Sequence, residues 1–264
     1  MPEGDTIHRL ANAMSPRLVG ARLERVEMEQ REVLRERVVT SVEAKGKHLL
    51  IGLGDLYLRT HLGLHGSWHR YPRGVPWKRP VWQASLVLRT ADDTFVCFNA
   101  NDVDCIKSSR LALHRSLRTL GPDLLGPTID VEVIVNRARA LAPFEPLANV
   151  LLVQRIASGI GNVYKSEVLF LTRHSPAARL SELSDDAVAD IYRVARDQLL
   201  ANVDRAIRTT TETHPRLWVY GRSRQPCLRC QSPIAFARMG RSRSTYWCPR
   251  CQPHAAAARS RRVR

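Results

Sequence analysis

The alternation of apolar and polar residues changes its period along the chain. Near the N-terminus, apolar residues recur every three or four positions, which predicts a helix from about Asp5 to Met14. From Leu56 to Leu64 every second residue is apolar or Thr, which is the period of a half-buried strand. Turn-forming residues at 91–93 predict a hairpin before the next apolar run. We therefore expect a β-rich N-terminal domain, residues 1–125, with one leading helix.

The middle of the chain follows a helical period instead. From about Val131 to Thr211 strand-type alternation is missing, so residues 126–221 are expected to form a helical domain. Within this domain, Leu151–Leu171 predicts two helices separated at Ser158–Asn162, where two glycines and an asparagine permit a tight reversal. The two parts together predict an α+β chain of several domains.

The charge of the chain indicates a polyanionic partner. Its 264 residues include 41 Lys and Arg against 25 Asp and Glu, a formal net charge of +16, which favours nucleic acid. No apolar run reaches the roughly 18 residues of a membrane span. The acidic start of the chain does not fit a secretory signal, so we expect a cytoplasmic protein without membrane attachment. The basic segment 253–264 is expected to be a disordered tail.

Four of the six cysteines form two CxxC pairs. Cys227 and Cys230 are followed, after 17 residues, by Cys248 and Cys251. This spacing predicts a structural Zn²⁺ site with four thiolate ligands, which leave no position for a reactive water. Two disulfides are the alternative, which a cytosolic chain disfavours. Residues 222–252 are too few for their own core, so zinc is expected to hold this hairpin folded.

The segment between the two CxxC pairs predicts a hairpin with a basic tip. Strand-like residues run out from Ile234 and return to Trp247. Arg238, Arg241 and Arg243 lie on the loop between them. A rigid ribbon with arginines at its tip suits contacts to phosphates.

Several short motifs occur in an order that resembles one family. They are Met1-Pro2-Glu3-Gly4, Lys45-Gly46-Lys47-His48-Leu49, Leu120-Gly121-Pro122-Asp123-Leu124-Leu125, Gln154 with Gly159-Ile160-Gly161-Asn162-Val163-Tyr164, and Val219-Tyr220-Gly221-Arg222 before the cysteine hairpin. Together they resemble the formamidopyrimidine-DNA glycosylase/endonuclease VIII family of DNA repair enzymes over residues 2 to 251. The opening Pro-Glu-Gly and the closing Tyr-Trp-Cys-Pro are most similar to the endonuclease VIII branch, particularly its actinobacterial members.

The resemblance implies a fold and an activity. The expected fold is an N-terminal β-sandwich with flanking helices, a helix–two-turn–helix domain and a zinc-finger hairpin, with damaged double-stranded DNA bound in the cleft between the two halves. The expected activity is that of a bifunctional glycosylase and AP lyase of base excision repair, acting on oxidised pyrimidines. A monomer associated with the bacterial nucleoid is expected.

The resemblance also implies three catalytic residues. Removal of Met1 would make Pro2 a secondary amine that attacks C1′ of the deoxyribose. The iminium ion formed is an electron sink that promotes β,δ-elimination of the flanking phosphates. Glu3 would be the general acid and base, and Lys47 would assist the leaving side and hold a phosphate. By themselves, Glu3 is equally compatible with a helix N-terminal acid and Lys47 with a solvated turn lysine.

The expected DNA contacts come from both halves of the chain. Asn162 would bind a phosphate at a helix start, and Arg243 would contact the backbone around the damaged nucleotide. Lys165 and Arg222 are further phosphate contacts. In isolation Asn162 is equally an ordinary helix cap.

The segment Gly63-Leu64-His65 falls where endonuclease VIII-like proteins carry intercalating residues. Leu64 would be a wedge that fills the space left by a flipped-out base, with His65 beside it. The alternation also permits Leu64 to be an ordinary core residue of a strand.

The chain departs from the family pattern at five positions. Gly63 and His65 replace the Gln and Tyr that commonly flank the Leu, Thr6 replaces a second acid, Val153 replaces Asp, and Glu145 replaces a basic residue. These departures leave open a weakly active or non-catalytic DNA-binding relative. Two further alternatives are a glycosylase for oxidised purines, which the endonuclease VIII-like loop around Leu64 disfavours, and a small zinc-ribbon ribosomal or transcription protein. The long β-rich half disfavours the zinc-ribbon protein.

Overall fold

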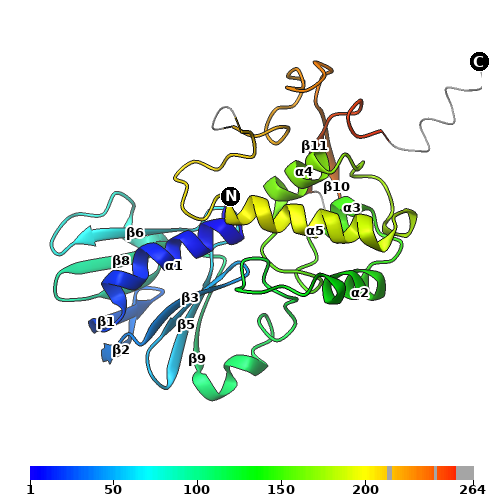
Figure 1. The fold of residues 1–264 in the computed structure, drawn as a ribbon. Helices are drawn as coiled ribbons and strands as arrows, with labels where there is room; N and C mark the ends of the chain where they lie inside the picture. The colour runs from blue at the N-terminus through cyan, green and yellow to red at the C-terminus, as the bar shows by residue number, and fades with distance from the viewer. Residues whose placement is uncertain (213–215, 241–242, 254–264) are drawn as a thin grey trace, which may run out of the picture. The chain divides into compact units, whose positions relative to one another are not determined.

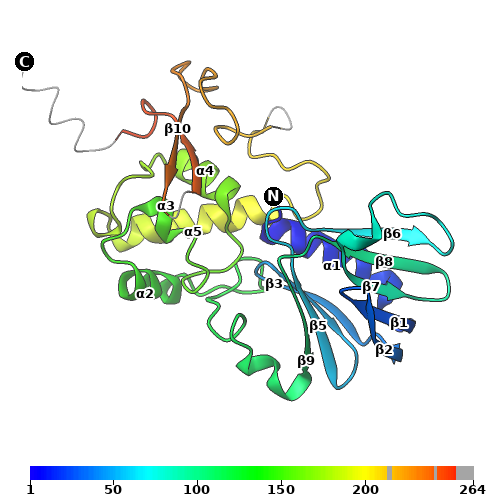
Figure 2. The same cartoon turned by 180° about the vertical axis from the view of Figure 1, so that it is seen from behind.

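The computed structural model describes residues 1–212, 216–240 and 243–253. By the contacts between its Cα atoms the chain divides into two units, Met1–Thr119 and Leu120–Arg264. Figures 1 and 2 show both units from opposite sides.

The first unit consists of one long helix and two sheets. Its elements in chain order are α1 (Gly4–Leu18), β1 (Arg22–Met28), β2 (Arg31–Val38), β3 (Ser41–Lys45), β4 (His48–Gly52), β5 (Leu56–His61), β6 (Ser67–Pro72), the 3₁₀ turn η1 (Val81–Gln83), β7 (Ala84–Arg89), β8 (Asp93–Phe98), β9 (Asp102–Lys107) and the 3₁₀ turn η2 (Ser108–Leu113). The strands form antiparallel sheets with the orders β2-β1-β7-β8-β6 and β3-β4-β5-β9. This is the β-sandwich with a leading helix that the sequence predicts.

The larger of the two apolar clusters in this unit joins the two sheets and α1. Figure 1 shows α1, in blue, lying along the β-sandwich, and it packs mainly on β3 and β4. The core side chains come from alternate strand positions and from one stripe of the helix, and include Ile7, Ala11, Met14, Leu18, Leu23, Val26, Leu49, Ile51, Leu58, Leu86, Leu88 and Phe95. Each of these Leu, Ile, Val, Met and Phe side chains contributes about 1.5–3 kcal/mol when buried, so the core fixes the helix on the hairpin of β3 and β4.

Two predicted boundaries in this unit differ from the structure. The helix continues to Leu18 because that side chain extends the buried stripe and is itself fully covered. Strand β5 ends at His61, because the chain turns at Gly63, whose φ is +60°. Leu64 therefore lies in a loop and not in a strand.

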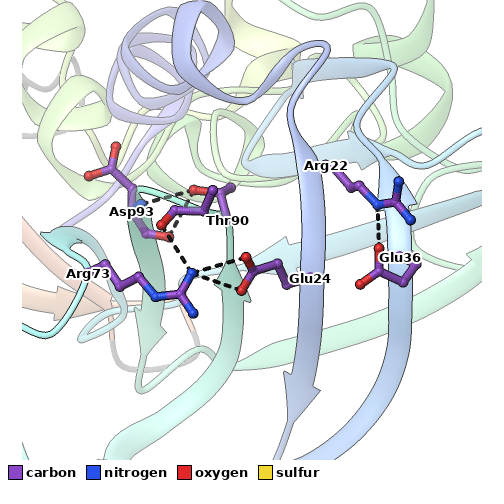
Figure 3. Close-up of polar contacts among 7 residues, drawn as sticks. Arg22, Glu24, Glu36, Arg73, Thr90 and Asp93 are labelled. Atoms are coloured by element: carbon purple, nitrogen blue, oxygen red, sulfur yellow. Dashed lines mark hydrogen bonds and ion pairs between the residues drawn. The ribbon is translucent and has the colours of Figure 1, made fainter.

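The predicted hairpin between β7 and β8 is confirmed. The backbone N–H of Thr90 donates to the carbonyl of Asp93 at 2.9 Å, and the Thr90 hydroxyl accepts from the Asp93 N–H at 3.0 Å. Figure 3 shows this turn beside two exposed ion pairs, Arg73 with Glu24 and Arg22 with Glu36. Such exposed pairs contribute about 0–1 kcal/mol each to the free energy of unfolding, so they connect neighbouring surface segments but add little to the stability of the fold.

The second unit is helical and ends in a hairpin. Its elements are α2 (Val131–Leu141), α3 (Leu147–Val150), α4 (Asn162–Leu171), the 3₁₀ turn η3 (Leu180–Glu182), α5 (Asp185–Leu200), β10 (Ala235–Met239) and β11 (Arg243–Trp247). Side-chain caps start two of the helices, since Asp130 accepts from Val133 N at 3.2 Å and Ser184 from Ala187 N at 3.3 Å. The buried α4 packs against α5, which in turn packs against α2.

The prediction of two helices across Leu151–Leu171 is wrong. Only α4 is helical there, and residues 151–161 form a chain of turns. The Gln154 side chain holds these turns together: its Nε2 donates to the carbonyls of Leu152 at 3.1 Å and Ile160 at 2.9 Å, and its Oε1 accepts from Gly159 N at 3.1 Å. A side-chain amide thus satisfies backbone groups that a helix would have satisfied.

The cysteine hairpin is the predicted antiparallel ribbon. Strands β10 and β11 pair from Ala235 with Trp247 to Met239 with Arg243, and both views show the ribbon beside α4. Arg241 and the tail 254–264 lie outside the described residues. The predicted finer division at 125, 221 and 252 stays a prediction.

Candidate functional site

The start of the chain places a buried carboxylate next to Pro2. Glu3 is the N-cap residue of α1, and its carbonyl accepts from Thr6 N at 3.0 Å and Ile7 N at 3.2 Å. Its side chain is 0% exposed, while Pro2 is half-buried. The N-terminus of a helix carries a partial positive charge, so this position stabilises a carboxylate and anionic groups near it.

Lys47 lies in a two-residue turn between β3 and β4. Lys45 and His48 are the paired residues that close the turn, and Gly46 has a φ of +58°. A positive φ at the first turn residue alone is the geometry of a type II′ hairpin, which glycine favours. Because α1 packs on both strands, the hairpin that carries Lys47 and the helix that begins beside Pro2 belong to one packed assembly.

A buried arginine lies behind this hairpin, and the sequence analysis missed it. Arg59 on β5 is 1% exposed. Its guanidinium donates to Asp102 at 2.9 Å, to Asp104 from Nε at 2.7 Å, and from Nη1 to Nδ1 of His48 at 2.8 Å. The side-chain hydrogen bond from Arg59 holds the pKa of Asp102 below its usual value. His114 adds a contact to Asp104 at 3.5 Å.

Two histidine rings join this charge cluster to the turn. The rings of His48 and His61 lie 4.9 Å apart, on paired positions of β4 and β5. Burial lowers the pKa of His48 to about 3, with further lowering from His61 and Arg59. Burial also lowers the pKa of His61, and the second cause is the charge of Lys47. Both rings are therefore neutral at physiological pH.

A compact loop after β5 presents Leu64. Leu64 is 51% exposed, and His65 beside it is also exposed, whereas Leu62 is buried. The N–H of Gly66 donates to the carbonyl of Leu62 at 2.9 Å, which closes the loop. A Cβ on Gly63 would meet the Cβ of Asn101 at 2.8 Å, so any larger residue at this position would clash with Asn101. The exposure of Leu64 therefore excludes the alternative that it is a core residue of a strand.

The predicted DNA-contact residues of the second unit differ from one another in exposure and in hydrogen bonding. Asn162 is the first residue of α4 and is 8% exposed. Arg243 begins β11 and is exposed, and its guanidinium has no hydrogen bond or ion pair among the residues that the structure describes. Arg222 instead caps its own turn, donating to the carbonyls of Trp218 at 2.6 Å and Pro226 at 2.8 Å.

Lys165 is fully buried, and its ammonium is committed to the hairpin. Its Nζ donates to the carbonyl of Ser244 and to the hydroxyl of Thr245, both at 2.8 Å. A third contact, to Asn162 Oδ1, is 3.4 Å long. In this conformation the lysine joins α4 to β11 and does not face solvent.

A second buried charge, also missed from the sequence, holds the segment before the cysteine hairpin. Glu167 on α4 accepts from the backbone N–H groups of Trp218 at 2.7 Å, Val219 at 2.9 Å and Tyr220 at 2.8 Å, and from the Thr210 hydroxyl. Burial raises the pKa of Glu167, and these four hydrogen bonds oppose that rise. The carboxylate fixes the approach to the hairpin.

The four cysteines of the CxxC pairs converge as the spacing predicts. Their sulfurs all lie within 4.8 Å of one another, with Cys227 to Cys251 at 3.9 Å and Cys230 to Cys248 at 3.4 Å. Tetrahedral zinc with Zn–S bonds of about 2.3 Å needs sulfurs about 3.8 Å apart. The backbone N–H groups of Arg229 and Cys251 also point to ligand sulfurs, at 3.4 and 3.5 Å. The donor set fits a closed metal site.

Comparisons with known proteins agree with this architecture. Residues 1–101 match the family model described as the formamidopyrimidine-DNA glycosylase N-terminal domain, and residues 120–214 match that of the formamidopyrimidine-DNA glycosylase H2TH domain. A crystal structure of the Lactococcus lactis formamidopyrimidine-DNA glycosylase bound to DNA with an AP site superposes with a TM-score of 0.82 at 19% identity, over 96% of this chain and 100% of that one.

Two relatives are similar over nearly their whole length. The chain is 39% identical to the probable endonuclease 8 2 of Streptomyces coelicolor, over 96% of this chain and 94% of the relative. It is 36% identical to the DNA-(apurinic or apyrimidinic site) lyase Nei2 of Mycolicibacterium smegmatis, over 96% of this chain and 99% of the relative.

The fold, the cysteine hairpin and these matches define a DNA glycosylase of base excision repair that is also an AP lyase. The chain belongs to the formamidopyrimidine-DNA glycosylase/endonuclease VIII family, in its endonuclease VIII-like branch. Among the described residues, no helix has the length and apolar character needed to cross a bilayer.

Proposed function

We propose that the chain removes oxidised pyrimidines from double-stranded DNA and then cuts the strand by β,δ-elimination, with Pro2 as the nucleophile. The observation that carries the proposal is the buried carboxylate of Glu3 beside Pro2, at the positive end of α1. The relatives named as endonuclease 8 support the endonuclease VIII-like branch, for which oxidised pyrimidines are the expected lesions.

The chemistry begins once Met1 has been removed. A free α-amino group has a pKa near 8, so a useful fraction of the Pro2 nitrogen is neutral at physiological pH. Its lone pair bonds to C1′, the bond from C1′ to the damaged base breaks, and the electrons leave on the base, which takes up a proton. The nitrogen loses its own N–H proton to solvent, so that its lone pair is available for the next step. Glu3 donates a proton to the ring oxygen, which opens the sugar and leaves a C1′ iminium ion on the proline.

The iminium ion then drives strand cleavage. It withdraws electrons from C2′, so a base can remove the C2′ proton, and the electron pair left behind expels the 3′ phosphate. In a second elimination a base removes the C4′ proton, and the electron pair left behind expels the 5′ phosphate. Water then hydrolyses the iminium ion to free the enzyme. Glu3 is proposed to move the C2′ proton, and Lys47 to hold and neutralise a phosphate next to the reacting sugar.

The DNA contacts are proposed to come from separate surfaces of the two units. In the first unit, the exposed Leu64 fills the space of the flipped-out base, with His65 beside it. In the second unit, Arg243 and the helix start at Asn162 bind phosphates. The internal hydrogen bonds of Lys165 and Arg222 support positioning roles for these two residues, in place of direct phosphate contacts.

Zinc is the metal proposed for the four-cysteine site. Four thiolates that converge from two CxxC turns match its preferred ligands and leave no open position, so the ion has a structural role. Cys227, Cys230, Cys248 and Cys251 would hold it. The short β10–β11 ribbon gains from the metal the folding free energy that a larger core would supply.

The protein is proposed to act as a monomer in the bacterial cytoplasm, associated with the nucleoid. Its net charge of +16 supports this location, because a basic protein is attracted to the main intracellular polyanion. Analytical ultracentrifugation with and without a lesion-bearing duplex measures the stoichiometry.

Borohydride trapping tests the nucleophile. Reduction of the iminium ion joins protein and abasic DNA through a stable C–N bond, so the mature protein is expected to give a covalent product. Mass spectrometry must first show that Met1 is absent. A processed protein that gives no product contradicts the proposal, and retained Met1 supports the non-catalytic alternative. Pro2→Gly is expected to lose trapping.

The lesion class is tested with duplexes that each carry a single oxidised pyrimidine or purine. The rates of base release from these duplexes are compared under single-turnover conditions. Faster release of oxidised pyrimidines is expected, and faster release of 8-oxoguanine or a formamidopyrimidine would favour the oxidised-purine alternative.

A further inference from the structure

Arg59 is a buried cation whose environment is too specific to be explained by stability alone. Its guanidinium contacts two carboxylates on β9 and a histidine on β4 while it is 1% exposed. Burying an ion pair costs desolvation free energy that the pairing often only offsets. An apolar side chain would fill the space between these strands as well, so the charge cluster indicates a role in geometry.

The cluster reaches the proposed reaction centre through His48. This residue follows Lys47 directly in the chain, and its Nδ1 lies 2.8 Å from Nη1 of Arg59. A guanidinium can only donate, so Nδ1 must accept, and the proton of His48 must be on Nε2. The ring of His61 packs on the other side at 4.9 Å. The His48 ring therefore has one tautomer and one orientation.

We propose that Arg59 is a positioning residue for Lys47, and that it acts by locking the His48 ring. The inference rests on the proposed role of Lys47 in strand cleavage. A turn of two residues has little freedom once its closing residue is fixed, so the anchored His48 sets the backbone position from which the Lys47 side chain extends. Arg59 itself touches neither DNA nor the reacting sugar in this assignment.

Misplacing a reacting group by about 1 Å lowers a rate by up to about 100-fold, whereas binding of the remaining phosphates is unaffected. Loss of the lock is therefore expected to lower the rate of strand cleavage and to leave DNA affinity nearly unchanged. A general loss of structure would lower both together.

The test uses four single variants and one double variant of the full-length protein. Arg59→Lys keeps a positive charge for the two carboxylates, but a single ammonium cannot reach all three partners. His48→Phe removes the acceptor and keeps a ring, while His48→Asn keeps an acceptor near the Nδ1 position. Arg73→Lys is the matched control, because Arg73 pairs with Glu24 at 3.0 Å on the surface of the same unit (Figure 3).

Two quantities are measured for each variant and for the Arg59→Lys/His48→Phe double variant. The first is the single-turnover rate of cleavage of an abasic duplex, and the second is the Kd of the protein for that duplex, by fluorescence anisotropy. Arg59→Lys and His48→Phe are each expected to slow cleavage about 10- to 100-fold with Kd within about threefold. The double variant should be no slower than the slower single variant. His48→Asn should recover most of the rate, and Arg73→Lys should match the wild type.

Multiplied rate losses in the double variant, or a loss of affinity that parallels the loss of rate, would overturn the inference. So would a ¹⁵N NMR spectrum with the His48 proton on Nδ1. A wild-type protein that does not cleave the abasic duplex refutes the proposed function instead, and the NMR spectrum of His48 still shows whether the lock exists.

Discussion

The Nζ of Lys165 lies 2.8 Å from the Oγ1 of Thr245, which fastens helix α4 to the returning strand of the cysteine hairpin. Both side chains are fully buried, and the same ammonium also donates to the carbonyl of Ser244. The lysine thus serves as an internal fastener between two parts of the second unit.

Replacing Lys165 by Met should destabilise the protein. The change leaves a buried hydroxyl and a carbonyl without a donor, which costs about 1–3 kcal/mol each. A clearly lower melting temperature is expected in differential scanning calorimetry, with Lys107→Met, an exposed position on β9, as the control. A variant with unchanged melting temperature and a salt dependence of DNA binding reduced by about one charge would instead support direct phosphate contact.

Lys47→Met should slow strand cleavage far more than Lys45→Met. The two lysines belong to the same hairpin, but Lys45 is an exposed pairing residue and Lys47 is the partly buried turn residue next to the His48 ring. Loss of a charge that stabilises the transition state costs about 100- to 1000-fold in rate. Single-turnover cleavage of an abasic duplex measures both, and equal rates for the two variants would refute the role of Lys47.

Leu64→Ala should impair base release while leaving stability intact. Leu64 is half exposed, so truncation removes little buried surface. A lesion in a duplex must be unstacked before it reacts, and without the wedge the flipped state is less populated. We expect slower release from duplexes and little change on single strands. Leu62→Ala, at a buried position of the same loop, should instead cost about 2–5 kcal/mol of stability.

Acid should destabilise the first unit partly through His48. Its pKa is about 3 in the folded state and about 6.5 when unfolded, so this contribution is complete above pH 6.5. As the pH falls from 6.5 towards 3, the unfolded state binds a proton that the folded state does not. The contribution is then lost at about 1.4 kcal/mol per pH unit.

His48→Asn removes this titration and keeps an acceptor for Arg59. Urea unfolding between pH 7.5 and 4.5 is expected to show a shallower loss of stability in the variant. Identical pH dependences would mean that the acid sensitivity comes from other groups, such as His61 or His174, whose pKa values are also lowered by burial.

Zinc and DNA binding should be lost together in Cys248→Ser. Cys248 is a buried member of the four-sulfur cluster, while Cys105 is an exposed thiol on β9 and provides the control as Cys105→Ser. One zinc per chain is expected in the control by atomic absorption, and less than one in Cys248→Ser. Weaker DNA binding should follow, because Arg243 lies on the ribbon that the metal stabilises. Full zinc content in Cys248→Ser would contradict the assignment.

Sequence patterns predicted the parts of the molecule whose structure depends on interactions between residues close together in the chain. The period of two, the turn at 91–93 and the two CxxC pairs each predicted a feature that the structure contains. The helical period missed the turns at 151–161, because the Gln154 amide that stabilises them acts across six residues and leaves no periodic signal.

The charge cluster was missed for a different reason. Alternation places Arg59 on the polar face of its strand, and the period of a half-buried strand gives no sign that this face is covered. Instead, η2 and the aspartates of β9 cover that face. A signal was present, since Asp102 and Asp104 stand two residues apart, as do Arg59 and His61, but only the pairing of β5 with β9 joins them.

The turn that carries Lys47 depends on a residue with no side chain. Gly46 holds a φ of +58°, which any other residue would adopt only with strain. A mutation there would redirect the lysine while every proposed reacting group stayed in the chain. A genetic screen would score such an allele as repair-deficient, and a scan limited to charged and polar positions would overlook its cause.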